Sequence, residues 1–223
     1  MIDLAERIQS YISKGSLQLV TFSFFIRLMY KKEDKEDKDD MQTEEYAIIK
    51  QCMDGNADIY SVLVERYKGM VYNIAYRMLG DTESANDMAQ ESFISAYIAL
   101  KDFKKNSKFS TWLCSIAINK CRDHLRSKKD TVSIDEIAEV SASKIATPED
   151  AACNRQIGHS IQTALNELPE EYREAVVLKH IEGLDYNEME NLLGVSSKTL
   201  KVRTHRGREM LKKLLRERGI SDG

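Results

Sequence analysis

The apolar residues of this chain recur at helical spacing, and they do so in two separate blocks. In the first block, steps of three and four residues build one apolar stripe, made of Ile59, Leu63, Tyr67, Met70, Ile74 and Met78. This spacing predicts an amphipathic helix with one buried face. Gly80 favours the end of that helix, and Asp81 or Thr82 is suited to cap the next one. Two further helices are expected to bury Ala85, Met88, Ala89, Phe93, Ala96 and Leu100, and then Trp112, Leu113, Ile116, Ala117 and Leu125.

The second block begins with a short stripe formed by Ile161, Leu165 and Leu168. Pro169 suits the first position of the helix that follows, and Gly183 suits its end. Residues 130–156, between the blocks, lose the periodicity and carry mostly acidic charge. An extended linker of this length would hold two folded parts tens of ångströms apart. We therefore predict an all-α protein, with a helical domain at 41–129, a flexible acidic linker at 130–156 and a second small helical domain at 157–218.

The first 40 residues differ from both blocks. The apolar run 17–30 is too short to span a bilayer, which needs about 20 apolar residues. The mixed-charge tract 31–40 cannot bury a core, and we expect it to be disordered. For the extension 1–40 as a whole, we predict a segment that is disordered or partly helical. Met41 then opens a segment typical of a protein start, which gives the hypothesis that translation begins there. N-terminal mass spectrometry of the native protein tests it, and a peptide from residues 1–40 would contradict it.

Composition narrows the class of protein. The chain has 223 residues with only two prolines, so long uninterrupted helices are permitted almost everywhere. The formal net charge of -3 argues against a protein that simply coats DNA. No zinc-binding pattern is present, and the cysteines are expected to be reduced and mostly buried in helices, at Cys52, Cys114, Cys121 and Cys153. Reduced thiols and the lack of a convincing signal peptide predict a cytoplasmic protein.

The sharpest pattern lies within the second block. Asp185 with Glu188 forms a capping-box pattern that opens a short helix. Gly194 supplies a tight turn, and Ser196 or Ser197 can cap the helix that follows. A short helix, a glycine-containing turn and a capped second helix together predict a helix-turn-helix.

The second helix of this motif is strongly basic. Its N-terminal half is the part that enters a major groove in such motifs, and arginine and lysine can pair with guanine edges or phosphates. The polar and basic residues there are Lys198, Thr199, Lys201, His205 and Arg206. The alternative is a solvated basic face with no partner. His205 has no second ligand at helical spacing, so the pattern favours DNA over a metal.

Two polar patterns mark the first block. Glu83, Asp87, Gln90 and Glu91 share one helix face, which serves either solubility or docking to a basic partner. Basic residues are interleaved with aromatic ones from Phe103 to Trp112, and basic residues continue to Lys129. Such interleaving is typical of single-stranded nucleic-acid binding. Phe109 and Trp112 are equally suited to the core.

Three stretches together resemble the region 2 and region 4 pair of the extracytoplasmic-function (ECF) sigma factors of bacterial RNA polymerase. They run from Leu79 to Phe93, from Phe109 to Asn119 with Asp123 and Arg126, and from Leu165 to Leu215. The resemblance implies a factor that binds core RNA polymerase, recognises the −35 and −10 promoter elements and promotes DNA melting. It also implies an anti-sigma factor as a partner, and no cofactor.

The resemblance also implies a role for each matching residue. Core polymerase would bind Asp87, Gln90 and Glu91. The −10 element would be bound and melted by Lys104, Lys105, Asn106, Ser107, Lys108, Phe109, Asn119, Arg122 and Arg126. The −35 element would be bound by Ser197, Lys198, Thr199, Lys201, Arg203, His205 and Arg206. The acidic linker would thread toward the RNA exit path.

The chain departs from the family pattern in the second helix of the motif. The family more often has Ser at Val202, a bulky apolar residue at Thr204 and Ala at Gly207, which puts the −35 sequence in doubt but not the role. Two other classes of protein were weighed. A conventional dimeric helix-turn-helix regulator leaves the first block unexplained. An enzyme lacks paired carboxylates near a His, a phosphate loop and metal-spaced ligands.

Overall fold

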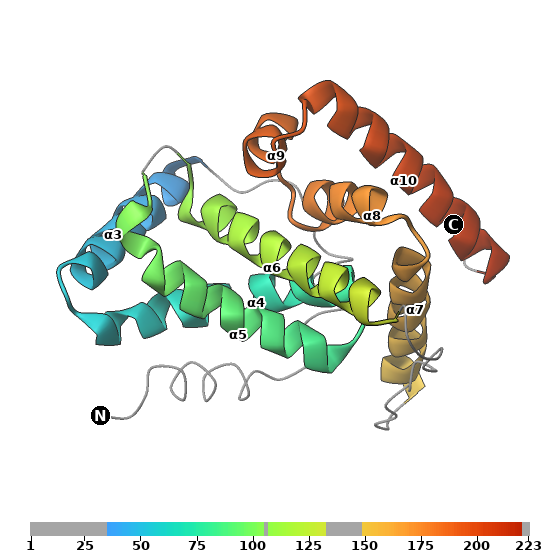
Figure 1. Ribbon diagram of the computed structural model, residues 1–223, viewed down its shortest axis with the longest axis horizontal. Coiled ribbons are helices and arrows are strands. Elements are labelled where there is room, and N and C mark those ends of the chain that lie inside the picture. The colour runs from blue at the N-terminus through green and yellow to red at the C-terminus, as the bar shows by residue number, and fades with distance from the viewer. Residues whose placement is uncertain (1–34, 105–106, 133–148, 220–223) are drawn as a thin grey trace.

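The computed structural model describes residues 35–104, 107–132 and 149–219, and every element within these ranges is helical (Figure 1). This confirms the all-α prediction. In chain order the elements are α3 (Lys35–Met53), η2 (Ala57–Ile59), α4 (Tyr60–Leu79), α5 (Thr82–Ile98), η3 (Leu100–Asp102), α6 (Phe109–Val132), α7 (Glu149–Asn166), α8 (Glu170–Val176), the π-helical segment η4 (Val177–Ile181), α9 (Tyr186–Leu193) and α10 (Ser197–Glu217).

Local sequence signals set most helix ends. Gly80 ends α4 in the left-handed region at φ 85°. Of the two candidate caps for α5, Asp81 is the one used, and its carboxylate accepts from the Ser84 N–H at 2.7 Å. Pro169 lies one position outside α8, as its N-cap, because its ψ of 140° is extended rather than helical.

The prediction of disorder for the whole tract 31–40 is wrong from Lys35 onward. Residues 31–34 lie outside the described part, but α3 begins at Lys35 and continues to Met53. The later part of α3 is docked, with Ile49 and Cys52 buried against the first block. Extending a formed helix fixes one residue per added hydrogen bond, so charged residues with good helix propensity can continue it without a core of their own.

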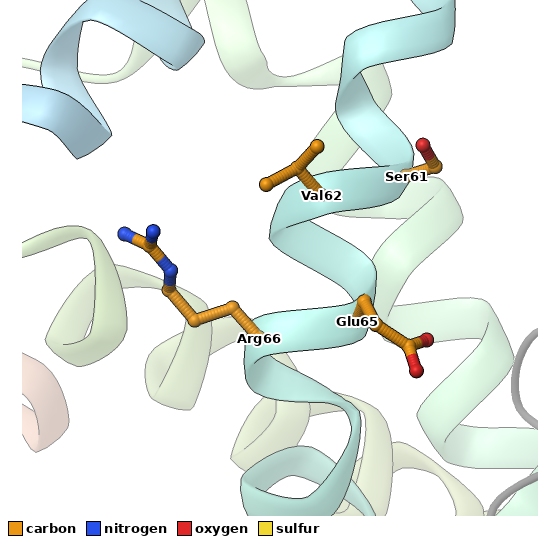
Figure 2. Close-up of a pocket in the computed structure, with 4 residues that line it drawn as sticks. All are labelled: Ser61, Val62, Glu65 and Arg66. Atoms are coloured by element: carbon orange, nitrogen blue, oxygen red, sulfur yellow. The ribbon is translucent and has the colours of Figure 1, made fainter.

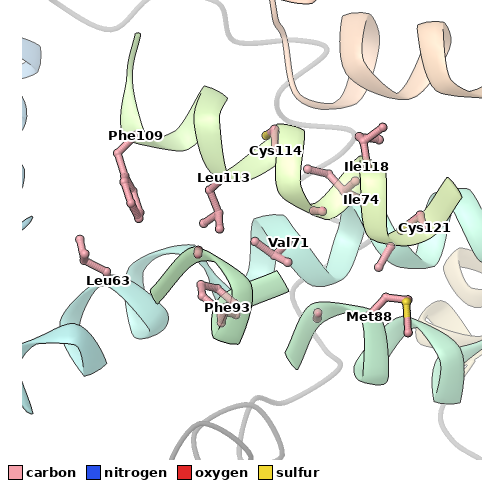
Figure 3. Packing of buried hydrophobic residues seen from close by; sticks show 14 of the residues in the cluster. Leu63, Val71, Ile74, Met88, Phe93, Phe109, Leu113, Cys114, Ile118 and Cys121 are labelled. Carbon is pink, nitrogen blue, oxygen red and sulfur yellow. The ribbon is translucent and has the colours of Figure 1, made fainter. Parts of the chain in front are cut away.

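The first block forms one core between α4, α5 and α6. Leu63, Val71 and Ile74 of α4 face Phe93 of α5 and Leu113 of α6, and all five are fully buried (Figure 3). Burying a side chain of this kind contributes about 1.5–3 kcal/mol. The apolar stripe predicted from the sequence therefore forms the surface of α4 that contacts α5 and α6.

Three of the four cysteines belong to this core, as predicted. Cys52, Cys114 and Cys121 are free and buried, while the side chain of Cys153 lies outside the described residues. Burial raises the pKa of the Cys121 thiol to about 12, so it stays protonated at neutral pH. In the described ranges, no group of His, Cys, Asp and Glu could hold a metal ion, and no helix is both long and apolar enough to cross a membrane.

The second block packs directly on the first. α7 and η4 contact α4, α9 contacts α6, and the apolar cluster continues from the first block into Val177, Leu178 and Met189 (Figure 1). Helix also extends into both ends of the predicted linker, because α6 runs to Val132 and α7 starts at Glu149. The two blocks are therefore in contact, and they are not held tens of ångströms apart by an extended linker.

Candidate nucleic-acid interfaces

The helix-turn-helix forms as its sequence predicts. The Asp185 carboxylate accepts from the Glu188 N–H at 2.8 Å, while the Glu188 side chain accepts from the Asp185 N–H at 2.9 Å, completing the capping box. Gly194 makes the turn at φ 65°. Of the two candidate caps for α10, Ser196 is used, accepting from the Thr199 N–H at 3.3 Å. The turn and both caps fix where α10 starts.

One face of α10 is held tightly on α8. Leu200, Thr204 and Gly207 are buried and follow each other at helical steps. A Cβ at Gly207 would lie 2.7 Å from Val176 Cγ2 and 3.0 Å from the Tyr172 carbonyl oxygen. The glycine therefore lets the two helices approach more closely than an alanine would. Two of the three departures from the family pattern, at Thr204 and Gly207, lie on this inner face.

The opposite face of α10 carries most of the predicted −35 residues. Those with exposed side chains are Lys198, Thr199, Lys201, His205 and Arg206. Ser197 is partly buried, and its N–H donates to Glu190 Oε2 at 3.0 Å. Val202, the third departure from the family pattern, is 45% exposed on this accessible part of the helix.

Arg203 does not join the outer face. Its Nη2 lies 2.7 Å from Glu171 Oε2, and its side chain is 24% exposed. Arg203 is three residues after Leu200 and four before Gly207, which places it beside the inner stripe of the helix. The structure thus gives Arg203 an ion pair within the second block, with a side chain that is less accessible than those of Lys198, Lys201 and Arg206.

The predicted −10 residues gather at α6 and the loop before it. Lys104, Ser107, Lys108, Asn119 and Arg126 have exposed side chains, whereas Lys105 and Asn106 lie outside the described residues. Arg122, between Asn119 and Arg126, is partly buried. Its Nη2 donates to Glu174 Oε2 of α8 at 2.8 Å, and its Nη1 lies 3.5 Å from Asn119 Oδ1.

Phe109 is a core residue. Its side chain is fully buried, and its ring centroid lies 5.6 Å from those of Tyr67 and Phe103 and 5.5 Å from that of Trp112. Of the two roles open for Phe109 from the sequence, the core role is the observed one, and no face of its ring is available to stack on a base. Figure 3 shows the Phe109 ring at the start of α6, directed into the core that α6 shares with α4 and α5.

The carboxylate face of α5 is accessible. Glu83, Asp87 and Glu91 are exposed and Gln90 is partly exposed, while Ala85, Met88, Ala89 and Phe93 bury the opposite side of the helix. Glu91 Oε2 lies 3.3 Å from Lys120 Nζ of α6. Exposed pairs of this kind contribute little to stability, so the acidic surface stays available to a cationic partner.

A hollow of about 490 Å³ lies along α4, lined by Ser61, Val62, Glu65 and Arg66. Figure 2 shows that these side chains spread to both sides of the helix and do not converge on a common point. A binding site for a small molecule needs several polar groups that face one position. This hollow has no such arrangement.

Comparison with known proteins identifies the two blocks. Residues 63–131 match the family model Sigma-70 region 2, and residues 158–211 match Sigma-70, region 4. The chain is 40% identical over 180 residues to the ECF RNA polymerase sigma factor SigW of Bacillus subtilis, covering 76% of this chain and 95% of SigW. It belongs to the ECF sigma factor family. The RNA polymerase sigma-H factor of Pseudomonas aeruginosa is 31% identical over 183 residues, which cover 78% of this chain and 95% of that one.

Solved structures share the fold of this chain. CnrH, in complex with the cytosolic domain of CnrY, has a TM-score of 0.57 and 28% identity, over 77% of this chain and 96% of CnrH. The sigma factor RpoE of Bartonella quintana, in complex with the anti-sigma factor NepR, shares the fold with a TM-score of 0.54 at 19% identity, over 79% and 97% of the two chains.

This ECF sigma factor therefore acts in promoter recognition and transcription initiation, as the resemblance implied. Region 2 holds nearly all of α4 together with α5 and α6, and region 4 runs from the second half of α7 to Leu211 within α10. The region 4 residues that contact region 2 were not among the predicted site residues. Glu174 is the clearest omission, because it directly precedes the apolar run Ala175–Leu178 and is itself 3% exposed. A carboxylate at the edge of such a run is a signal that could have been recognised.

Proposed function

We propose that the chain reads the two promoter elements with separate surfaces and docks on RNA polymerase with a third. The outer face of α10 binds the −35 duplex, α6 with its preceding loop binds the −10 strand, and the carboxylate face of α5 binds core polymerase. The observation that carries this proposal is the exposed row of cationic and polar side chains on α10, held outward by the close contact of Gly207 with α8.

At the −35 element, α10 enters the major groove by its N-terminal half. The groove is about 12 Å wide and admits a helix, and lysine or arginine can pair with the O6 and N7 acceptors of guanine. Lys198, Thr199 and Lys201 lie in the first two turns of α10, and His205 and Arg206 follow one turn later. Arg203 supports this helix through Glu171 and does not contact bases.

At the −10 element, the exposed groups of α6 suit an unpaired strand. Asn119 offers an amide that can donate and accept, and Lys104, Lys108 and Arg126 offer positive charge along one side. Flipping a base out of the stack costs a few kcal/mol, which contacts to the extruded base offset. Region 2 is a small surface for this work, so docking on polymerase supplies further binding energy.

We assign docking on core polymerase to Asp87, Gln90 and Glu91. Their side chains lie on the accessible face of α5, and Glu91 Oε2 lies 3.3 Å from Lys120 Nζ of α6. Charge complementarity with a basic polymerase surface sets orientation and association rate. Once docked, the two DNA-reading surfaces bind one promoter together and act as a bivalent reader.

The family also suggests a protein inhibitor. CnrH is bound to the cytosolic domain of CnrY, and RpoE to the anti-sigma factor NepR. We extend this to the present chain as a partner that covers the α5 and α6 surfaces. We place the protein in the cytoplasm, where its relatives work with RNA polymerase, and we assign it no catalytic reaction.

Run-off transcription tests the proposal. Purified core polymerase is supplied with genomic promoter fragments, with and without this protein. Discrete new transcripts whose templates share a −35 and a −10 pattern are the expected result. An absence of transcripts, together with footprints on duplex DNA by the protein alone, would overturn the proposal in favour of a conventional regulator.

A further inference from the structure

Val202 is an apolar side chain in the middle of the cationic face of α10. It is one of four exposed large hydrophobic side chains among the described residues, at 45% exposed. Val62 of α4, at 41%, is comparable, but it lies outside the surfaces that we assign to DNA. Scattered exposed apolar residues are common on proteins, so exposure alone indicates no function. The position of Val202 on its helix is what distinguishes it.

Val202 lies opposite the face that holds α10 on α8. Successive residues of an α-helix are about 100° apart, so residues two positions away lie on the other side of the helix. For Val202 these are Leu200 and Thr204, and both are buried. Figure 1 shows α8 beside α10, and the two helices are in contact. The packing of region 4 therefore does not require an apolar group at position 202.

Residues that we assign to the −35 element surround Val202. Neighbours on a helix surface lie three and four positions apart. For Val202, the exposed neighbours at these positions are Lys198, Thr199, His205 and Arg206. Lys201, directly before Val202, is exposed as well. Val202 is therefore at the centre of the face that we assign to the −35 duplex.

The charge around Val202 indicates the class of its partner. Three of the surrounding side chains, Lys198, Lys201 and Arg206, are cations, and no residue from 198 to 206 is acidic. A surface of this charge attracts a polyanion, and the phosphates of duplex DNA provide one. When cations at the edge of such a face contact phosphates, the residue at its centre lies over the base edges in the major groove. Duplex DNA is therefore the partner that suits this face.

The chemistry of valine indicates the base. Base edges in the major groove carry hydrogen-bond donors and acceptors, and the C5-methyl of thymine is the apolar group among them. A valine side chain makes no hydrogen bond, and covering a polar base edge without one is unfavourable. Its two methyl groups are held in nearly one rotamer on a helix, so little freedom is lost when they contact a thymine. A serine at this position would instead pair with polar edges of several bases.

We propose that Val202 determines specificity at the −35 element by contacting the C5-methyl group of a thymine. The cations around it supply affinity and orientation, and the valine distinguishes thymine from the other bases. This inference rests on the proposed assignment of the outer face of α10 to the −35 duplex. It adds a residue that the assignment does not contain, and it names the chemical group that this residue recognises.

Selection from a duplex library tests the inference in the complete holoenzyme. Core polymerase with the full-length chain is given promoter duplexes whose −35 window is randomised, and the bound fraction is sequenced. The wild type should enrich thymine at one position of a wider pattern. Val202→Ser should lose that preference and keep the rest of the pattern, while Val202→Thr, which retains one methyl group, should keep most of it. Val62→Ser, at a valine of similar exposure on α4, is the matched control and should select as the wild type does.

Deoxyuridine shows whether the methyl group itself is recognised. It lacks only the C5-methyl of thymidine and keeps the same hydrogen-bonding edge. In competition binding by the holoenzyme, replacing that one thymine should weaken wild-type binding about fourfold, the effect expected when one methyl group is no longer buried. For Val202→Ser the same replacement should have almost no effect, because the contact is already absent.

The outcomes separate this inference from the assignment on which it rests. If the wild type enriches no −35 pattern, the assignment of α10 fails and the role of Val202 fails with it. If a pattern is enriched but Val202→Ser keeps the thymine preference or responds to deoxyuridine as the wild type does, the assignment stands and the thymine contact is wrong. If Val202→Ser binds every duplex more weakly with unchanged preference, Val202 contacts polymerase and not a base, which also overturns the proposal.

Discussion

The two DNA-facing surfaces of this sigma factor use the same side chains but present them differently. On α10, Lys198, Lys201 and Arg206 extend outward from a helix whose inner face is fixed by Leu200 and Gly207. On α6, the corresponding cation Arg122 is partly buried against a carboxylate from another region. These cations of α10 are exposed, whereas Arg122 of α6 is paired with a carboxylate of region 4.

The difference shows that a basic residue at the right spacing is only a candidate until its neighbours are known. Arg203 is an example within region 4. Its position on the helix places it next to Glu171, with which it pairs, and not on the outer face of α10. Whether a basic side chain is accessible to DNA depends on the residues that pack against it. The predictions below separate the two surfaces, from the largest effect to the smallest.

Reversing two charges on the open surface gives the largest effect. With Lys198→Glu and Arg206→Glu in one chain, we expect −35-dependent transcription to fall at least about 100-fold, because two contacts are lost and two repulsions with phosphate are added. Duplex binding measured over a range of salt should also show a flatter dependence. Unchanged single-strand binding by the same variant is the control, and a parallel loss there would argue against separate surfaces.

Removing the exposed Asn119 amide of α6 gives a smaller effect. Asn119→Ala should weaken single-strand binding by the holoenzyme about tenfold, the result expected when one good base contact is lost. Abortive transcription from a promoter with an intact −35 element measures it. Asn56→Ala, at an exposed asparagine before η2 whose side chain makes no capping hydrogen bond, is a matched control and should leave transcription unchanged.

Adding a methyl group at two glycines tests why α10 faces outward. Gly207→Ala should destabilise the protein by about 1–3 kcal/mol, because the new Cβ would overlap Val176 and the Tyr172 carbonyl. Gly69→Ala, in the middle of α4 with nothing within 4 Å of its Cβ position, should stabilise by up to about 1 kcal/mol. Urea unfolding measures both. If both variants changed the free energy of unfolding in the same direction, the contact of α10 with α8 would not be tight.

Removing the cap of α9 gives the smallest effect and one that depends on pH. Asp185→Ala should cost about 1 kcal/mol at neutral pH. Hydrogen bonds from the Glu188 and Asn187 N–H groups lower the pKa of Asp185 below its ordinary value of 3.8. A lowered native pKa contributes stability that is present above 3.8 and is lost as the pH falls through the native pKa. The gap between wild type and variant in urea unfolding should therefore shrink in strong acid and stay constant from pH 5 to 7.

The features that could be predicted from the sequence are local ones. The capping box at Asp185 and Glu188, the turn at Gly194 and the end of α4 at Gly80 each depend on residues within four positions of one another. The apolar stripes depend only on helical spacing. Both kinds of signal survive in the structure, which is why the fold class and the helix-turn-helix were predicted correctly.

The contact between regions could not be predicted this way. Arg122 and Glu174 are separated by 52 residues, and Arg77 and Gln162 by 85. No periodic pattern links such partners, and an acidic linker between two complete amphipathic blocks favours separate domains. The role of Gly207 could not be predicted either. Helix propensity alone treats a glycine in mid-helix as destabilising, and it carries no information on the close approach of α8.

The separation of Arg122 from Glu174 also has a consequence for how the chain is made. Region 2 leaves the ribosome first, and its cationic surface is complete before Glu174 has been added. At about 5–20 residues per second, the 52 residues between them take about 3–10 s to synthesise. During that interval Arg122 lacks the carboxylate with which it pairs in the finished chain.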